Sequence, residues 1–277
     1  MLSFKVYNSI NNILVVAPHA DDEILACGGL LHKLKRTRRD DVTITIALLT
    51  YNDACENSGE NRIIKEFVKA ARIIGADKII LPNEKLTKEL ELIDLKNDLS
   101  SLGGDPFEAF WDNFIPPNGD TIKSITKFIR LCDADLVITT HPNDFHTDHR
   151  NVAIAAKEAC YQAGRRFVFE ENKEYFKNPL LLYGYVDIEF NSLFKPDFIF
   201  ELDEIDVETK KKALHIYDSF AELIGKGDLP ENIKTLKGDK VLMDFVYIST
   251  RMFGGMINSK FGEAFQIGNI KPLKLQI

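Results

Sequence analysis

Short apolar runs alternate with segments of helical apolar spacing along the first third of the chain. The runs at 12–17, 42–49 and 78–81 each end in a proline or a polar turn, as buried strands do. The segments at 22–35 and 60–74 carry apolar residues three and four positions apart, which predicts helices. This alternation with short connections predicts a Rossmann-like α/β fold, a mostly parallel sheet with helices on both faces.

The same pattern returns in the second half of the chain. A helix near 119–132 precedes a buried strand at 134–140, and a helix follows over 148–163. Four further elements are expected, two strands at 180–186 and 198–202 and two helices at 207–220 and 240–252. Because no linker or internal repeat divides the chain, we predict a single elaborated domain over 1–277.

One segment, 83–118, interrupts this regularity. It mixes a charged helical stretch with Gly103-Gly104, Trp111 and Pro116-Pro117. The segment is too polar and too punctuated to continue the sheet, so we expect an insertion or a lid near the site. A surface excursion or an interface element explains the same pattern equally well.

Composition narrows the classes of partner. The net charge of -7 and the lack of a basic patch argue against nucleic acid or an anionic membrane as the main partner. The one basic run, at 35–39, fits a solvated helix end next to the negative pole of the helix dipole. No apolar run approaches the roughly 20 residues that span a bilayer, and the N-terminus lacks the pattern of a leader. We therefore expect a cytoplasmic protein.

The first candidate site lies directly after the first predicted strand, in Pro18-His19-Ala20-Asp21-Asp22-Glu23. A strand-to-helix turn at the carboxyl end of a sheet strand is where α/β proteins bind ligands. His19 and Asp22 can converge on one metal ion across this turn, while Asp21 can face whatever the metal holds. We expect Glu23 to stabilise the first turn of its helix through the helix dipole.

A second cluster, at residues 141–150, follows the predicted strand at 134–140 and contains His141, His146 and His149. Two imidazoles and one carboxylate with an open position suit catalytic zinc, and equally the facial triad of non-haem iron enzymes. A nucleotide-binding module fits less well, because the first turn offers carboxylates where a phosphate needs backbone amides.

The two clusters resemble the motifs of a known family. Pro18–Glu23 resembles the Pro-His-Pro-Asp-Asp-Glu motif of the LmbE-like, or PIG-L, zinc-dependent N-deacetylases, and residues 146–150 resemble their His-Pro-Asp-His-Arg motif. Weaker similarities lie within 62–75, 211–219 and 261–265. The resemblance covers nearly the whole chain except 83–118.

The resemblance implies roles for the residues of both clusters. One Zn²⁺ per chain would be bound by His19, Asp22 and His149, with Asp21 as the general base and His146 polarising the carbonyl or acting as an acid.

Four further residues complete the predicted site. We expect His141 and Asp148 to orient His146 and His149, with capping of the following helix an equally good role for Asp148. Arg62 and Arg150 could hold substrate hydroxyls or a charged aglycone, or form surface salt bridges.

The implied reaction is removal of the N-acetyl group from an N-acetylglucosamine unit in a small glycoside or glycoconjugate. The same groups could hydrolyse a different amide, and a homo-oligomer is possible. An iron oxygenase is a weaker alternative, because a carboxylate such as Asp21 beside the metal has a role in hydrolysis and none in oxygen activation.

Overall fold

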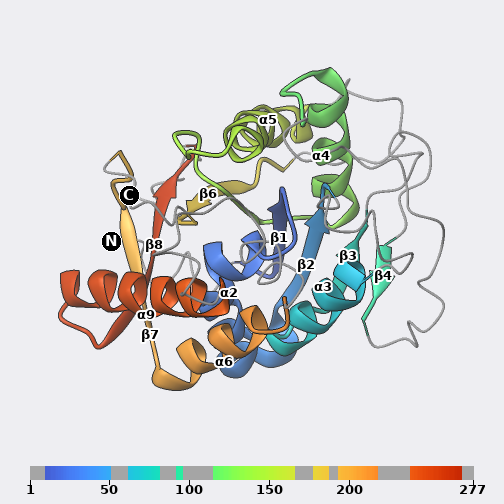
Figure 1. Ribbon diagram of the computed structural model, residues 1–277. Coiled ribbons are helices and arrows are strands. Elements are labelled where there is room, and N and C mark those ends of the chain that lie inside the picture. Colours follow the sequence, from blue (N-terminus) through green and yellow to red (C-terminus); the bar gives the residue numbers. More distant parts are fainter. Residues whose placement is uncertain are drawn as a thin grey trace, which may run out of the picture.

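A computed structural model describes residues 10–50, 62–81, 92–95, 115–165, 177–186, 193–217 and 238–269. Its centre is a sheet of eight strands in the order β4-β3-β2-β1-β5-β6-β8-β7 (Figure 1). The strands are β1 Asn12–Ala17, β2 Thr43–Leu48, β3 Lys78–Ile80, β4 Leu92–Asp94, β5 Leu136–Thr139, β6 Leu180–Gly184, β7 Phe198–Leu202 and β8 Phe261–Ile267.

The middle of the sheet is parallel. Strands β3, β2, β1, β5 and β6 pair in parallel, with Val15 opposite Ile46 on one side and Ile138 on the other. Strand β4 runs antiparallel to β3, and β8 runs antiparallel to both β6 and β7. The predicted class, a mostly parallel α/β sheet, is therefore confirmed.

Helices cover both faces of the sheet (Figure 1). One face carries α2 Asp22–Arg38, α3 Arg62–Ile73, α6 Glu204–Leu214 and α9 Gly238–Met256, and the other carries α4 Gly119–Leu131 and α5 Thr147–Ala163. A 3₁₀ turn, η1 Arg39–Asp41, follows α2. Among the described residues, no helix combines the length and apolar character needed to cross a membrane.

Alternate residues of β1 enter two separate cores. Ile13, Val15 and Ala17 belong to the core with α2, whereas Leu14 and Val16 pack with the residues of α4 and α5. Side chains of successive strand residues point to opposite faces, so a strand covered on both sides must be apolar throughout. This explains the uninterrupted apolar run that predicted β1.

Two strands were not predicted. We expected 83–118 to leave the sheet, which is wrong for β4, because these three residues form an antiparallel edge strand beside β3. A short edge strand has only one neighbour and needs no continuous apolar run. Strand β8 was also missed. Residues 83–91 and 96–114 lie outside the described part, so the lid remains a prediction.

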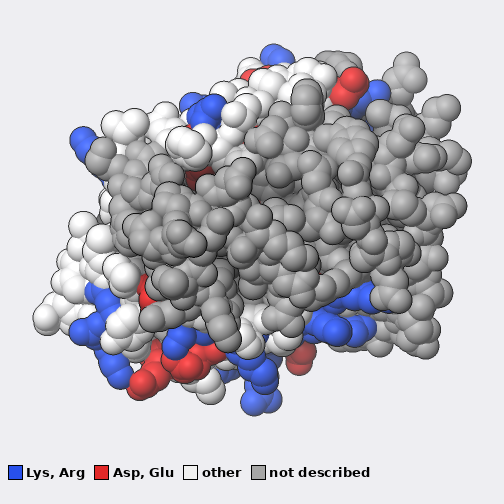
Figure 2. All heavy atoms as spheres, viewed as in Figure 1, with Lys and Arg blue, Asp and Glu red and all other residues white. Residues whose placement is uncertain are grey.

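Ion pairs join α6 to α2 along one edge of the molecule. Arg36 pairs with Asp203 and, at 3.2 Å, with Asp206, while His32 Nδ1 lies 2.8 Å from Asp206 Oδ1. Basic and acidic side chains accordingly lie side by side along the lower edge of Figure 2. Helix α6 starts earlier than predicted, at Glu204, because Asp203 and Asp206 form a capping box there.

Candidate metal centre

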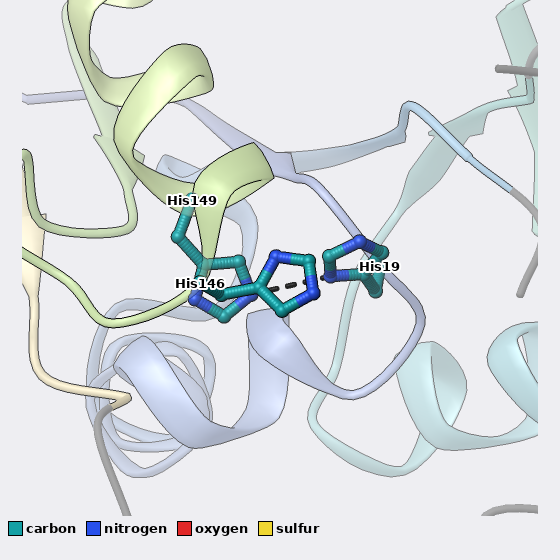
Figure 3. A group of neighbouring side chains, drawn as sticks. All are labelled: His19, His146 and His149. Carbon is teal, nitrogen blue, oxygen red and sulfur yellow. Dashed lines mark hydrogen bonds between the residues drawn. The ribbon is translucent and has the colours of Figure 1, made fainter. Parts of the chain in front are cut away.

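The two sequence clusters meet because β1 and β5 are parallel neighbours. Their registered residues, such as Ile13 and Leu136, bring both carboxyl ends to the same edge of the sheet. The turn after β1 carries His19 and leads into α2, and the loop after β5 leads into α5. Figure 3 shows His146 and His149 at the start of α5, with His19 opposite them.

Three side-chain atoms form a compact triangle at this edge. His19 Nδ1 lies 3.2 Å from His149 Nε2 and 3.4 Å from Asp22 Oδ2, and His149 Nε2 lies 3.2 Å from Asp22 Oδ2. Tetrahedral zinc with bonds of 2.0 to 2.1 Å holds neighbouring ligand atoms about 3.3 Å apart. The three atoms therefore fit one face of a zinc coordination tetrahedron.

His146 stands beside this triangle. One ring nitrogen from each of His19, His146 and His149 lies within 4.8 Å of the others. The set that contains Asp22 is tighter, which favours it as the ligand set. His146 is the N-cap of α5, and its Nδ1 accepts a hydrogen bond of 3.2 Å from the Asp148 amide.

A carboxylate lies behind each of the two imidazoles of the triangle. Asp148 Oδ2 is 3.1 Å from His19 Nε2, and Asp144 Oδ1 is 3.1 Å from His149 Nδ1. Such partners fix the ring orientation and the tautomer of metal-binding histidines. We expected Asp148 to orient His146 and His149. Its backbone amide does bond to His146 Nδ1, but its carboxylate lies against His19, which we did not expect. Asp144, which takes the position behind His149, was not predicted.

His141 lies at the end of β5 on the side of β8. Its Nε2 is 2.6 Å from Gln266 Oε1, and its Nδ1 accepts a hydrogen bond of 3.1 Å from the Asn143 amide. Its ring also meets Tyr183 and Phe194 edge to face. His141 thus braces the loop against the neighbouring strand rather than standing behind a ring of the triangle.

Arg150 is engaged with its own loop. Its guanidinium donates to the carbonyls of Asp144 (2.9 Å) and Phe145 (2.5 Å) and to Thr147 Oγ1 (3.1 Å). These bonds hold the segment between β5 and α5, a role that we did not predict. The side chain of Arg62, the other candidate substrate-binding arginine, lies outside the described part of the structure.

The charges of the site shift its pKa values in opposite directions. Burial, together with the negative charges of Asp22 and Glu23, raises the pKa of Asp21 well above its usual value. Burial also acts to raise the pKa of Asp22, but the charge and hydrogen bond of His149 outweigh it and lower that pKa.

For His149, burial acts to lower the pKa, yet Asp22 and Asp144 raise it to about 10. The pocket therefore stabilises one positive charge between Asp22 and Asp144. A metal cation bound there would displace the proton of His149.

The first turn has an unusual backbone. Asp21 has φ 111° and ψ -28°, a left-handed conformation that costs on the order of 1 to 3 kcal/mol outside glycine. Its amide donates a hydrogen bond of 3.0 Å to Glu23 Oε2, and the hydroxyl of Tyr217 donates to Glu23 Oε1.

We expected Glu23 to act through the helix dipole, but its side chain is fully buried and engaged in these bonds. Burial raises the pKa of Glu23 to about 7 against the opposing effect of the Tyr217 hydrogen bond. Tyr217 carried no signal in the sequence.

Comparison with known proteins shows the family and the fold. The sequence model of the GlcNAc-PI de-N-acetylase family, PIG-L, matches residues 14–160. The fold is similar to that of N,N'-diacetylchitobiose deacetylase from Pyrococcus horikoshii, with a TM-score of 0.67, 20% identity and coverage of 99% of this chain and 91% of that one.

Two other solved structures share the fold. The 4-carboxy-2-hydroxymuconate hydratase of Pseudomonas putida has a TM-score of 0.65 at 15% identity, covering 96% of this chain and 99% of that one. A deacetylase of an antimicrobial pseudoaglycone has a TM-score of 0.57 at 17% identity, covering 95% and 100%. At such identities these likenesses establish the fold, whereas the sequence match spans more than half of the chain. The chain therefore belongs to the PIG-L family.

Proposed function

We propose that this protein is a zinc-dependent N-deacetylase that removes the acetyl group from an N-acetylglucosamine unit of a small glycoside or glycoconjugate. The observation that carries the proposal is the triangle of His19 Nδ1, Asp22 Oδ2 and His149 Nε2 with Asp21 next to it in the turn. Family membership and two similar structures described as deacetylases support the same reaction class.

The metal would be held by His19, Asp22 and His149, with Asp148 and Asp144 fixing the two rings. Zinc in such a site lowers the pKa of a bound water to about 7 and so supplies a nucleophile at neutral pH. Two neutral imidazoles and one carboxylate leave a coordination position for that water and for substrate.

Asp21 acts as the general base in this proposal. Its raised pKa lets the carboxylate take a proton from the attacking water and release it again to the departing nitrogen. The new C–O bond forms on the acetyl carbon, the C–N bond breaks, and the proton that leaves the water ends on the amine. Acetate and a free amino sugar are the products.

His146 acts as a hydrogen-bond donor to the oxyanion of the tetrahedral intermediate. Because its Nδ1 accepts the Asp148 amide proton, the neutral ring carries its own proton on Nε2. A single donor of this kind is typically worth about 3 to 4 kcal/mol of transition-state stabilisation. The helix cap thus also sets the tautomer that catalysis needs.

The same groups would hydrolyse other amides, so a substrate with a different acyl group is the nearest alternative. An iron enzyme with two histidines and one carboxylate is less consistent with the site, because oxygen activation has no use for the base Asp21.

Amine release from a panel of N-acetyl and longer N-acyl glucosaminides by the zinc-reconstituted protein tests the proposal. Asp21→Asn is the matched variant, because asparagine tolerates the left-handed backbone as aspartate does. We expect wild type to release amine from the N-acetyl compounds, and the variant to bind zinc and release none. If only the longer N-acyl compounds react, the substrate is an amide with a longer acyl group and not an N-acetyl sugar. Absence of bound zinc would overturn the proposal.

A further inference from the structure

We propose that Glu23 and Tyr217 are positioning residues that hold the general base Asp21 in its working conformation. The proposal rests on the proposed function, in which Asp21 moves the proton during amide hydrolysis. The proposed metal chemistry uses neither residue. Within the described part of the chain, the side-chain hydrogen bonds of Glu23 join it to Asp21 and Tyr217.

Hydrogen bonds hold both the amide and the carbonyl of Asp21. Its carbonyl accepts hydrogen bonds of 2.9 Å from the amides of Ile24 and Leu25, which begin the hydrogen bonding of α2. Its own amide points to Glu23 Oε2 at 3.0 Å. The left-handed conformation of Asp21 is unfavourable on its own and persists only where surrounding bonds fix it. The carboxylate of Glu23 supplies the bond on the amide side.

Glu23 is in turn held by a residue that is 194 positions away in the sequence. Tyr217 follows α6, is 2% exposed, and donates its hydroxyl proton to Glu23 Oε1. Helix α6 is fixed against α2 by Lys210, whose Nζ donates to the Leu25 carbonyl at 2.8 Å and to Glu263 at 2.6 Å. The docking of α6 therefore determines where the Tyr217 hydroxyl lies, and through Glu23 where the Asp21 amide lies.

Burial separates this role from substrate binding. Glu23 has 0% exposure, so its side chain is closed to solvent and to a substrate that enters from solvent. Its influence on the reaction must pass through the backbone of Asp21. A displacement of a catalytic group by about 1 Å can lower the rate by about 100-fold, so loss of this support should reduce kcat more than KM.

Four variants test the proposal. Glu23→Ala removes both hydrogen bonds and should lower kcat by about 100-fold, and Tyr217→Phe removes one and should lower it by about tenfold. Glu23→Gln keeps both contacts, because its oxygen can accept from the Asp21 amide while its NH₂ donates to the Tyr217 hydroxyl, so kcat should stay within about threefold. Val207→Ala, in the same buried face of α6, is the control for weaker helix packing and should leave kcat unchanged.

The kinetics are interpreted on folded protein with a full complement of zinc. The positioning role is supported if KM stays within about twofold of wild type in all four variants and kcat falls most in Glu23→Ala, less in Tyr217→Phe and least in Glu23→Gln and Val207→Ala. Wild-type kcat in zinc-loaded Glu23→Ala would overturn it, and so would an equal loss in Glu23→Gln, because hydrogen bonding would then not be the cause.

A second measurement needs no substrate. Amide hydrogen exchange at Asp21, followed by NMR, should be at least about tenfold faster in Glu23→Ala than in wild type and unchanged in Val207→Ala. Equal exchange rates at Asp21 in Glu23→Ala and wild type would overturn the positioning role of Glu23 and Tyr217, whatever substrate the enzyme hydrolyses. Failure of every N-acyl sugar to react, with the exchange difference present, would instead count against the proposed function alone.

Discussion

The two turns that form the candidate metal centre are built in different ways. The turn after β1 is short, contains the strained Asp21, and depends on Glu23 and on Tyr217 from a distant part of the chain. The loop after β5 is longer and is held largely by the helix that follows it, since Arg150 of α5 donates to two of its carbonyls, while His141 also contacts Gln266 of β8. The short turn concentrates reactive groups but takes its support from a distant part of the chain, whereas the longer loop takes much of its support from nearby residues.

The turns also support each other. Asp148 of the second cluster orients His19 of the first, and Asp22 of the first contacts His149 of the second. Each turn therefore needs the other to hold its candidate ligand in place. Substitution of a candidate ligand in either turn should therefore reduce zinc binding to a similar extent. Substitution of a residue that supports only the backbone of one turn should have a different effect from its counterpart in the other turn.

The largest effects are expected at the ligands. His19→Ala and His149→Ala each remove one of three protein ligands, so zinc should be lost and amine release should fall to background. Zinc per chain, measured by mass spectrometry after dialysis, checks this prediction. Retention of full zinc in either variant would show that its turn does not hold the metal.

The next largest effect on kcat is expected at His146, which we propose is a hydrogen-bond donor and not a zinc ligand. His146→Ala should keep zinc and lower kcat by about 10² to 10³, because one oxyanion donor is lost. Single-turnover amine release together with zinc content gives the comparison. Loss of zinc in this variant would instead move His146 into the ligand set.

Smaller effects are expected from the carboxylates behind the rings. Asp148 contacts His19 of the other turn, whereas Asp144 contacts His149 of its own cluster. Asp148→Asn and Asp144→Asn should each weaken zinc binding by about 10- to 100-fold. Competition with a chromophoric chelator measures the affinity. Asp120→Asn, at the first turn of α4, is the control and should bind zinc as wild type does. An unchanged affinity in Asp148→Asn would contradict the support of one turn by the other.

The smallest effect on the reaction is expected at the opposite ends of the same two strands. Asp135 accepts hydrogen bonds of 2.9 Å from the amides of Asn11 and Asn12 and pairs with Lys177 at 2.5 Å. Burial acts to raise its pKa, but Lys177 and the two amides lower it overall. Asp135→Asn should leave kcat unchanged and lower the free energy of unfolding by about 1 to 3 kcal/mol at pH 7.

The stabilisation by Asp135 depends on pH in a defined direction. Since its folded pKa is below the unfolded value of about 3.9, the stabilisation is fully present above that value and is lost as pH falls through the folded pKa. Urea unfolding of wild type and variant should give curves that converge toward pH 3. A gap in stability that is the same at pH 7 and pH 3 would contradict the assignment.

Much of the fold and site could be predicted because the signals are local. The fully apolar run of β1 indicated a strand covered on both faces, and the ends of β1 and β5 indicated where His19 and His149 would meet. The two turns meet because β1 and β5 are parallel neighbours, and the alternation of elements already constrains that arrangement.

What could not be predicted depends on tertiary docking. Tyr217 meets Glu23 only because α6 packs on α2, and no spacing in the sequence encodes a contact between residues so far apart. The contact between the Asp148 carboxylate and His19 was missed because it depends on how α5 faces the first turn. Asp144 does precede His146 at a spacing typical of a local turn, so its bond to the His146 amide could have been found.

Zinc-edge anomalous scattering from crystals of the zinc-loaded protein would locate the metal and its ligands. We predict one peak per chain, about 2.0 to 2.2 Å from His19 Nδ1, Asp22 Oδ2 and His149 Nε2. A peak bound by His19, His146 and His149 with Asp22 outside the coordination sphere would contradict it, as would the absence of any peak at this edge of the sheet.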